Sequence, residues 1–86
     1  MIFIFKALSC LKRAYDLNPL AWNVCYNLGL IYLNRKQYAS SFHYLSSAVN
    51  LNSKNGRLYM WVAIVLYNLC DQDNAETAYK KALKIE

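Results

Sequence analysis

A register of 34 residues runs through this chain and constrains its fold more than any other feature. Residues of similar size recur at this spacing, in the sets Ala7/Ser41/Ala75, Leu11/Leu45/Tyr79, Ala14/Ala48/Ala82 and Leu17/Leu51/Ile85. Few of the aligned residues are identical. What repeats is residue size at every third or fourth position, which is the requirement of helix packing. The chain is therefore predicted to be a series of similar helical units in register.

The stretch from Ala21 to Lys54 is predicted to form one complete unit of two helices. Its first half carries small or apolar residues on one helical stripe, namely Cys25, Leu28, Gly29 and Tyr32. A polar break follows, and a second stripe then begins at Tyr38. Each stripe would be exposed unless it packed on the other, so the unit is expected to be a helical hairpin. Gly29 stands where the two helices would cross most closely.

Turn and cap residues divide the chain into five expected helices. Asn18–Pro19 ends the first, because a residue before proline is pushed out of the helical region, and Pro19 suits the first turn of the next. Residues 52–56 supply turn and cap chemistry at the next unit boundary. Asp73 is expected to cap the last helix, with Glu76 three residues later as in a capping box. The expected helices span about 4–17, 20–34, 38–51, 56–69 and 73–85.

The segment Leu28–Gly29–Leu30–Ile31–Tyr32, taken with the 34-residue period, resembles the tetratricopeptide (TPR) repeat. The resemblance implies an all-α fold in which TPR helical hairpins stack as a right-handed superhelix of about two and a half repeats. Residues 1–86 would form a single TPR domain, with a partial repeat at 1–19, a full repeat at 20–54 and a near-complete repeat at 55–86.

Two apolar segments are interpreted within this register. Met1–Phe5 lacks the preceding basic segment and the cleavage site of a signal peptide. It falls where the first helix of a repeat would end, so we expect the chain to begin midway through a repeat and to self-associate through this apolar segment. Leu58–Leu69 is apolar almost all round, but it is shorter than the roughly 20 residues needed to cross a bilayer.

The ionisable residues do not predict catalysis. Cys10, Cys25 and Cys70 have no metal-binding or redox spacing and are expected to be small buried residues in a reducing compartment. His43 is the only histidine, so neither a metal site nor a cofactor is predicted. The net charge of +5 comes from scattered lysine and arginine residues, an arrangement that does not favour nucleic-acid binding. The sequence therefore favours a binding protein that is not an enzyme.

The TPR resemblance implies an inner, concave face lined by the first helix of each repeat. The candidate partner-binding residues on that face are Asn23, Tyr26, Leu30, Leu33, Asn34, Arg57, Met60, Ile64, Tyr67 and Asn68. Tyr26, Met60 and Tyr67 favour protein contact, because aromatic and methionine side chains are enriched in the cores of interfaces. Tyr26 and Leu30 stand where TPR modules that clamp a carboxylate would want basic or amide groups. A helical or extended protein segment is therefore the expected partner.

The segments 26–52 and 56–86 are also similar to consecutive repeats of the TPR subunits of the BBSome, the coat-like complex that moves membrane cargo in and out of cilia. This resemblance implies a scaffold in ciliary membrane-protein trafficking and cilium assembly, with BBSome subunits and pericentriolar or motor-linked proteins as partners. It also implies a cytoplasmic location at the basal body, centrosome or centriolar satellites.

Three alternatives stay open. The chain could belong to another TPR adaptor, such as a cochaperone, an anaphase subunit or an intraflagellar-transport subunit. It could also be the TPR part of a larger enzyme. Nucleic-acid binding driven by the +5 charge is the third alternative, and its strong salt dependence would reveal it.

Overall fold

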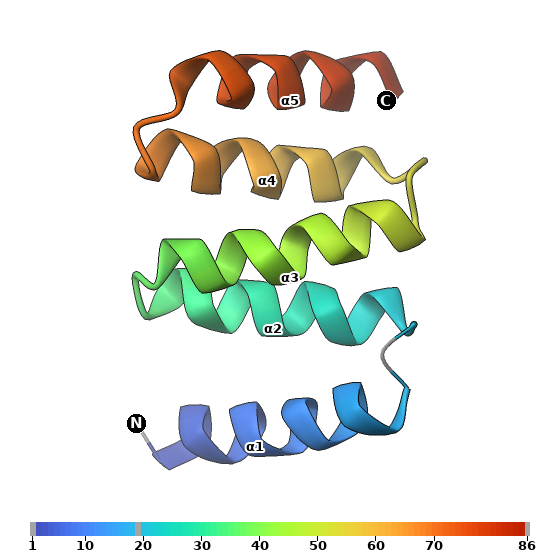
Figure 1. Ribbon diagram of the computed structural model, residues 1–86, viewed down its shortest axis with the longest axis vertical. Helices are drawn as coiled ribbons and strands as arrows, with labels where there is room; N and C mark the ends of the chain where they lie inside the picture. The colour runs from blue at the N-terminus through green and yellow to red at the C-terminus, as the bar shows by residue number, and fades with distance from the viewer. Residues whose placement is uncertain (1, 19, 86) are drawn as a thin grey trace.

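The computed structural model describes residues 2–18 and 20–85, with side chains from residue 8 onward. Five helices follow one another: α1 (Ile2–Leu17), α2 (Trp22–Asn34), α3 (Tyr38–Leu51), α4 (Gly56–Asn68) and α5 (Gln72–Ile85) (Figure 1). Over these two ranges all the regular structure is helical, which confirms the predicted all-α class. The predicted helix bounds agree with the structure to within two residues.

The helices stack in chain order, each antiparallel to the one before it (Figure 1). The closest pairs are α2 with α3 and α4 with α5, so the chain contains two tight hairpins, α2–α3 and α4–α5. Helix α4 joins them by packing on α3, and α1 packs on α2. The first and last helices therefore lie at opposite ends of a stack that measures 35 × 24 × 16 Å.

Hairpin α2–α3 closes around Gly29, as the sequence predicts. A Cβ placed on Gly29 would lie 2.5 Å from Cγ of Leu45 and 3.3 Å from its backbone nitrogen. The hydroxyl of Ser41, buried in the same crossing, donates to the Gly29 carbonyl at 2.7 Å. The small residues Gly29 and Ser41 thus allow the backbone of α2 to approach the Leu45 side chain of α3. The buried hydroxyl of Ser41 has a hydrogen-bond partner.

The core is divided along the stack. The largest cluster joins α3, α4 and α5 and contains Leu45, Val62, Ala63, Val65, Leu66, Ala75 and Ala78. Trp61 is partly buried and packs against this cluster. Near the other end, Leu8, Leu28 and Tyr32 join α1 to α2, and the Tyr32 ring stacks on that of Tyr44 with centroids 5.5 Å apart.

Both hairpins turn through the same helix-ending motif. Lys36 and Cys70, which are 34 residues apart, adopt left-handed backbone conformations with φ of 60° and 63°. At the first turn the amide of Lys36 donates to Leu33 and that of Gln37 donates to Tyr32. At the second turn the amide of Cys70 donates to Tyr67 and that of Asp71 donates to Leu66. In each turn this pair of hydrogen bonds forms a Schellman motif.

This turn corrects the predicted cap of α5. Because Cys70 reverses the chain sharply, Asp71 becomes the residue that precedes the helix, which starts at Gln72. The carboxylate of Asp71 accepts from the backbone amide of Asn74 at 3.4 Å and from its side-chain amide at 2.7 Å. Asp73 lies inside the helix and does not cap it, and Glu76 pairs with Lys80 at 3.2 Å rather than closing a capping box.

The cysteine prediction is right for one residue and wrong for two. Cys25 is fully buried, whereas Cys10 and Cys70 are exposed. Cys70 stands in the turn between α4 and α5, and Cys10 lies on α1 with its side chain exposed. The predictions for Pro19 and for the side chains of Met1–Phe5 fall outside the described residues. Among the helices that the structure describes, none combines the length and apolar character needed to cross a membrane.

Candidate functional site

The ten residues predicted from the resemblance lie on α2 and α4 and differ in exposure between the two helices. On α2, Tyr26 and Leu33 are half-buried and pack against the α3–α5 core cluster. Leu30 is half-buried, and Asn23 and Asn34 are exposed. The apolar residues of α2 are therefore largely occupied in packing the stack.

The predicted residues of α4 are more open. Ile64 is 40% exposed and Tyr67 is 67% exposed, and Met60 beside them is half-buried. Together with α5 they border an open groove of about 570 Å³, the end groove, lined by Met60, Ala63, Ile64, Tyr67, Gln72, Ala75, Glu76 and Tyr79. The structure thus brings three of the ten predicted residues together and adds a second wall that the sequence reasoning missed.

The wall from α5 could have been found from the 34-residue register. Tyr79 aligns with Leu45, which is 0% exposed in the core cluster, whereas Tyr79 is 47% exposed. A large apolar residue at a repeat's core position indicates a packing surface on the second helix as well as the first. The prediction had assigned partner contacts to first helices only, following the family's general pattern.

Two polar residues of the predicted set, Arg57 and Asn68, do not line the end groove. Arg57 lies with Trp22, Tyr26, Asn55 and Leu58 around a small cavity of about 190 Å³ between α2 and the start of α4. There the side chain of Asn55 accepts from the backbone amide of Arg57 at 3.1 Å and caps α4. Asn68 donates its side-chain amide to the Ile64 carbonyl of its own helix at 2.8 Å. The ten residues do not form one continuous site.

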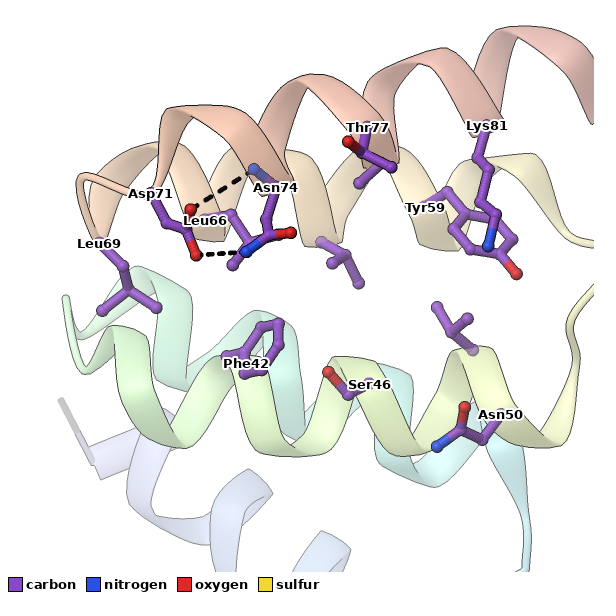
Figure 2. Close-up of a pocket in the computed structure, with 13 residues that line it drawn as sticks. Phe42, Ser46, Asn50, Tyr59, Leu66, Leu69, Asp71, Asn74, Thr77 and Lys81 are labelled. Carbon is purple, nitrogen blue, oxygen red and sulfur yellow. Dashed lines mark hydrogen bonds between the residues drawn. The ribbon is translucent and has the colours of Figure 1, made fainter.

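A second hollow lies between α3 and α5, with α4 as its floor (Figure 2). This α3/α5 groove has a volume of about 660 Å³ and is lined by Phe42, Ser46, Val49, Asn50, Tyr59, Val62, Leu66, Leu69, Asp71, Asn74, Thr77, Ala78 and Lys81. In Figure 2, Phe42, Leu66 and Leu69 lie toward one end, and Asn50, Tyr59 and Lys81 lie toward the other. None of these residues was predicted from the sequence as a site residue.

The charged side chains that line the grooves are Glu76 in the end groove and Asp71 and Lys81 in the α3/α5 groove. Glu76 at the end groove pairs with Lys80, and both side chains are well exposed. In the α3/α5 groove the ammonium of Lys81 lies 5.6 Å from the centre of the Tyr59 ring, a cation–π distance. Over residues 2–18 and 20–85 no group of three histidine, cysteine or acidic side chains could hold a metal ion. His43 is exposed, with its ring edge against Tyr44.

Among the described residues, two groups have shifted pKa values, the buried Cys25 and the half-buried Tyr44, and neither lines a groove. Burial raises the pKa of the Cys25 thiol, and burial followed by the neighbouring Tyr32 raises the pKa of the Tyr44 phenol. Both shifts favour the neutral form, which is the opposite of what activates a nucleophile. The grooves offer apolar surface and hydrogen-bonding side chains, which is an arrangement suited to binding a polypeptide.

The sequence matches the Tetratricopeptide repeat family over residues 23–55 and 56–86. It is 52% identical over 80 residues to the BBSome complex member BBS4 of Bos taurus and 43% identical over 76 residues to the BBS4 homolog of Drosophila melanogaster. These alignments cover 93% and 88% of this chain but only 15% and 16% of the relatives, so the chain spans about a sixth of their length.

Solved structures of MamA have the same fold as this chain. One superposes with a TM-score of 0.90 over 96% of this chain and 49% of its own length, at 20% identity. A point mutant of MamA superposes with a TM-score of 0.86 over 99% of this chain and 69% of its own, at 17% identity. At these identities the likeness shows the helical-repeat architecture alone.

Proposed function

We propose that this chain, which belongs to the tetratricopeptide repeat family, is a non-catalytic scaffold for protein–protein interaction. We place residues 1–86 in one domain, with a partial repeat at 1–19, a full repeat at 20–54 and a near-complete repeat at 55–86. The observation that carries the proposal is the end groove, where Ile64, Tyr67 and Tyr79 expose apolar surface on a packed pair of helices.

The contacts of the preceding hairpin support a protein segment as the partner of this groove. Tyr26, Leu33 and Phe42 of hairpin α2–α3 are the counterparts of Met60, Tyr67 and Glu76, and they pack against the cluster that α4 and α5 supply. The end groove presents the same positions without such a cover among the described residues. A helical or extended protein segment that buried two or three of these side chains would gain about 2 kcal/mol from each central anchor.

Similarity to BBS4 supports a more specific role. We assign the chain to a BBSome subunit that acts in ciliary membrane-protein trafficking and cilium assembly, with other BBSome subunits and pericentriolar or motor-linked proteins as partners. The proposed location is cytoplasmic, at the basal body, centrosome or centriolar satellites. Partner contacts outside the end groove are also proposed for the other residues of the predicted inner face, Asn23, Tyr26, Leu30, Leu33, Asn34, Arg57 and Asn68.

Affinity capture from ciliated cells, with the captured BBSome subunits identified by mass spectrometry, tests this function. We choose Ile64→Ser with Tyr67→Ser because both side chains are exposed, whereas Tyr26 packs on the core. The double variant should recover BBSome subunits at least about tenfold less well than the wild type, since a loss of about 1.4 kcal/mol corresponds to tenfold. Leu17→Ser is the matched control, an exposed leucine on α1 outside both grooves.

Two outcomes would count against this function. Equal recovery with the double variant, while circular dichroism shows it folded, would remove the end groove as the contact surface. If the wild-type chain recovers no BBSome subunit, the BBSome assignment is wrong. Recovery of chaperones or of anaphase or intraflagellar-transport subunits in their place would then identify the chain as another TPR adaptor.

A further inference from the structure

We propose that the α3/α5 groove is a second binding site, for an extended peptide segment with one bulky apolar side chain and an acidic side chain three residues farther along. This site is separate from the end groove, because the two share no lining residue. It goes beyond the proposed scaffold function, since it lies between the second helices of two repeats and contains none of the ten predicted residues.

One end of the groove is built to receive an apolar side chain. Phe42 of α3 and Leu66 of α4 face each other there, and Leu69, 41% exposed at the end of α4, borders the same space (Figure 2). Leu66 is buried in the largest core cluster and Phe42 packs against that cluster, so the walls are held by the fold. A leucine-sized side chain entering here would lose its water contact against preformed apolar surface.

The other end presents a cation and hydrogen-bonding groups. Lys81 of α5 holds its ammonium near the Tyr59 ring, and Asn50 of α3 lies across the groove from it (Figure 2). Within residues 2–18 and 20–85 the ion pair that α5 makes is Lys80 with Glu76, so Lys81 has no carboxylate partner there. A carboxylate entering at this end could accept from Lys81 and from the amide of Asn50.

The charged side chains of the groove determine which of its ends binds the acidic side chain of the peptide. The groove contains two charged side chains, Asp71 beside the apolar end and Lys81 at the polar end. Asp71 already accepts two hydrogen bonds from Asn74 and would repel a second carboxylate. The acidic side chain is therefore directed to Lys81, and the apolar side chain occupies the end next to Asp71.

The length of the groove sets the spacing of the two side chains. Asn74 and Lys81 are seven residues apart on α5, which corresponds to about 10 Å along a helix. An extended segment in the polyproline II conformation covers this distance in about three residues, at roughly 3.1 Å each, and because it has three residues per turn it presents residues i and i+3 on the same side. The favoured ligand is thus an extended peptide with leucine and glutamate separated by two residues.

The test is a titration of the full isotope-labelled chain, followed by nuclear magnetic resonance, with a capped peptide of sequence Ser-Leu-Ser-Ser-Glu-Ser. Resonances of Phe42, Leu69 and Lys81 should shift on binding. Lys81→Gln should raise the Kd about two- to fivefold, as expected for one partly exposed ion pair, and about 0.5 M salt should remove that difference. Lys80→Gln, one residue away on the same helix, is the matched control and should leave the Kd unchanged.

A second pair of variants tests the apolar end. Leu69→Ser should weaken binding, whereas Leu83→Ser, an exposed leucine of α5 outside this groove, should not. Three results would overturn the proposal: equal affinity for a peptide with glutamine in place of glutamate, equal effects of Lys81→Gln and Lys80→Gln, or shifts confined to Ile64 and Tyr67. Shifts of the groove resonances with protein concentration alone would make a second copy of the chain the occupant, and the peptide proposal would then be wrong.

Discussion

Hairpins α2–α3 and α4–α5 share one register but differ in what covers them. Leu45 in the first hairpin is 0% exposed and its counterpart Tyr79 in the second is 47% exposed. Helix α4 packs on α3, whereas α5 ends the described stack. The same position in the repeat is thus core in one hairpin and surface in the other.

The residue types of the two hairpins differ in the same way as their exposure. Where the covered hairpin has Tyr38 and Phe42, the open one has Gln72 and Glu76 at the same places in the register. Aromatic side chains are used where they can be buried, and polar ones border the open groove. Large apolar side chains nevertheless persist at Ile64, Tyr67 and Tyr79. The open hairpin therefore combines a helix-packing surface with polar edges, as protein interfaces do.

The largest expected difference between the hairpins is at Leu45 and Tyr79. Leu45→Ala should lower the free energy of unfolding by about 2–5 kcal/mol, because it leaves a cavity in a fully buried cluster. Tyr79→Ala should lower it by less than about 1 kcal/mol, because the side chain is half in solvent. Urea titrations monitored by circular dichroism measure both values. Similar losses at the two positions would show that the hairpins are equally covered in solution.

The next largest effect concerns the helix crossings. Gly29→Leu should cost about 1–3 kcal/mol, since even a Cβ would lie 2.5 Å from Cγ of Leu45. Ala63, its counterpart in the open hairpin, lines the end groove together with the exposed Tyr79, so Ala63→Leu should cost less because the Tyr79 side chain can move. Thermal unfolding of the two variants provides the comparison. A neutral Gly29→Leu variant would mean that the crossing of α2 and α3 is misplaced.

The turns should respond equally in both hairpins, whatever covers the helices. Lys36→Gly and Cys70→Gly should each raise the free energy of unfolding by about 1 kcal/mol, because both residues hold a left-handed conformation that glycine adopts without penalty. The measurement is again denaturant titration. Gly56, in the first turn of α4, has a helical backbone without positive φ. The variant Gly56→Ala therefore measures the effect of glycine where no left-handed conformation is involved. Destabilisation by either glycine would contradict the left-handed assignment at that turn.

The smallest effect is a pH dependence carried by the covered hairpin. Burial raises the pKa of Cys25, so the folded state holds its thiol proton to higher pH than the unfolded state does. The contribution of Cys25 to stability is therefore fully present below the unfolded pKa of about 8.5 and falls as pH rises above it. Cys25→Ala should flatten the alkaline decline in Tm, and Cys70→Ala should not.

Thiol labelling checks the same contrast by a second route. In the native chain a disulfide reagent should modify the exposed Cys10 and Cys70 quickly and the buried Cys25 only after unfolding. Fast native labelling of Cys25 would show that the contact between α2, α3 and α4 around it opens readily. The control is the same reaction in denaturant, where all three thiols should react alike.

The amino-acid sequence by itself determined the helices, their order and the hairpin crossing. Residue size at every third or fourth position reports helix packing directly, so the 34-residue register predicted five helices and the close approach at Gly29. Residues 52–56 were also expected to supply a cap before α4, and the structure identifies Asn55 as the residue that caps it. The helices depend on local backbone preferences, and the crossing depends on the helix that comes next in the chain.

Only the tertiary structure decided which repeat positions are buried by a neighbouring helix, which residue caps α5 and where the grooves lie. Lys36 and Cys70 give no glycine signal for a left-handed turn, so the shift of the cap from Asp73 to Asp71 could not be read from residue type. The α3/α5 groove depends on the distance between two helices that are not consecutive, and residue spacing does not set that distance. Exposure in a repeat stack depends on what lies next along the stack, so the same position of the 34-residue register is core in one hairpin and exposed surface in the other.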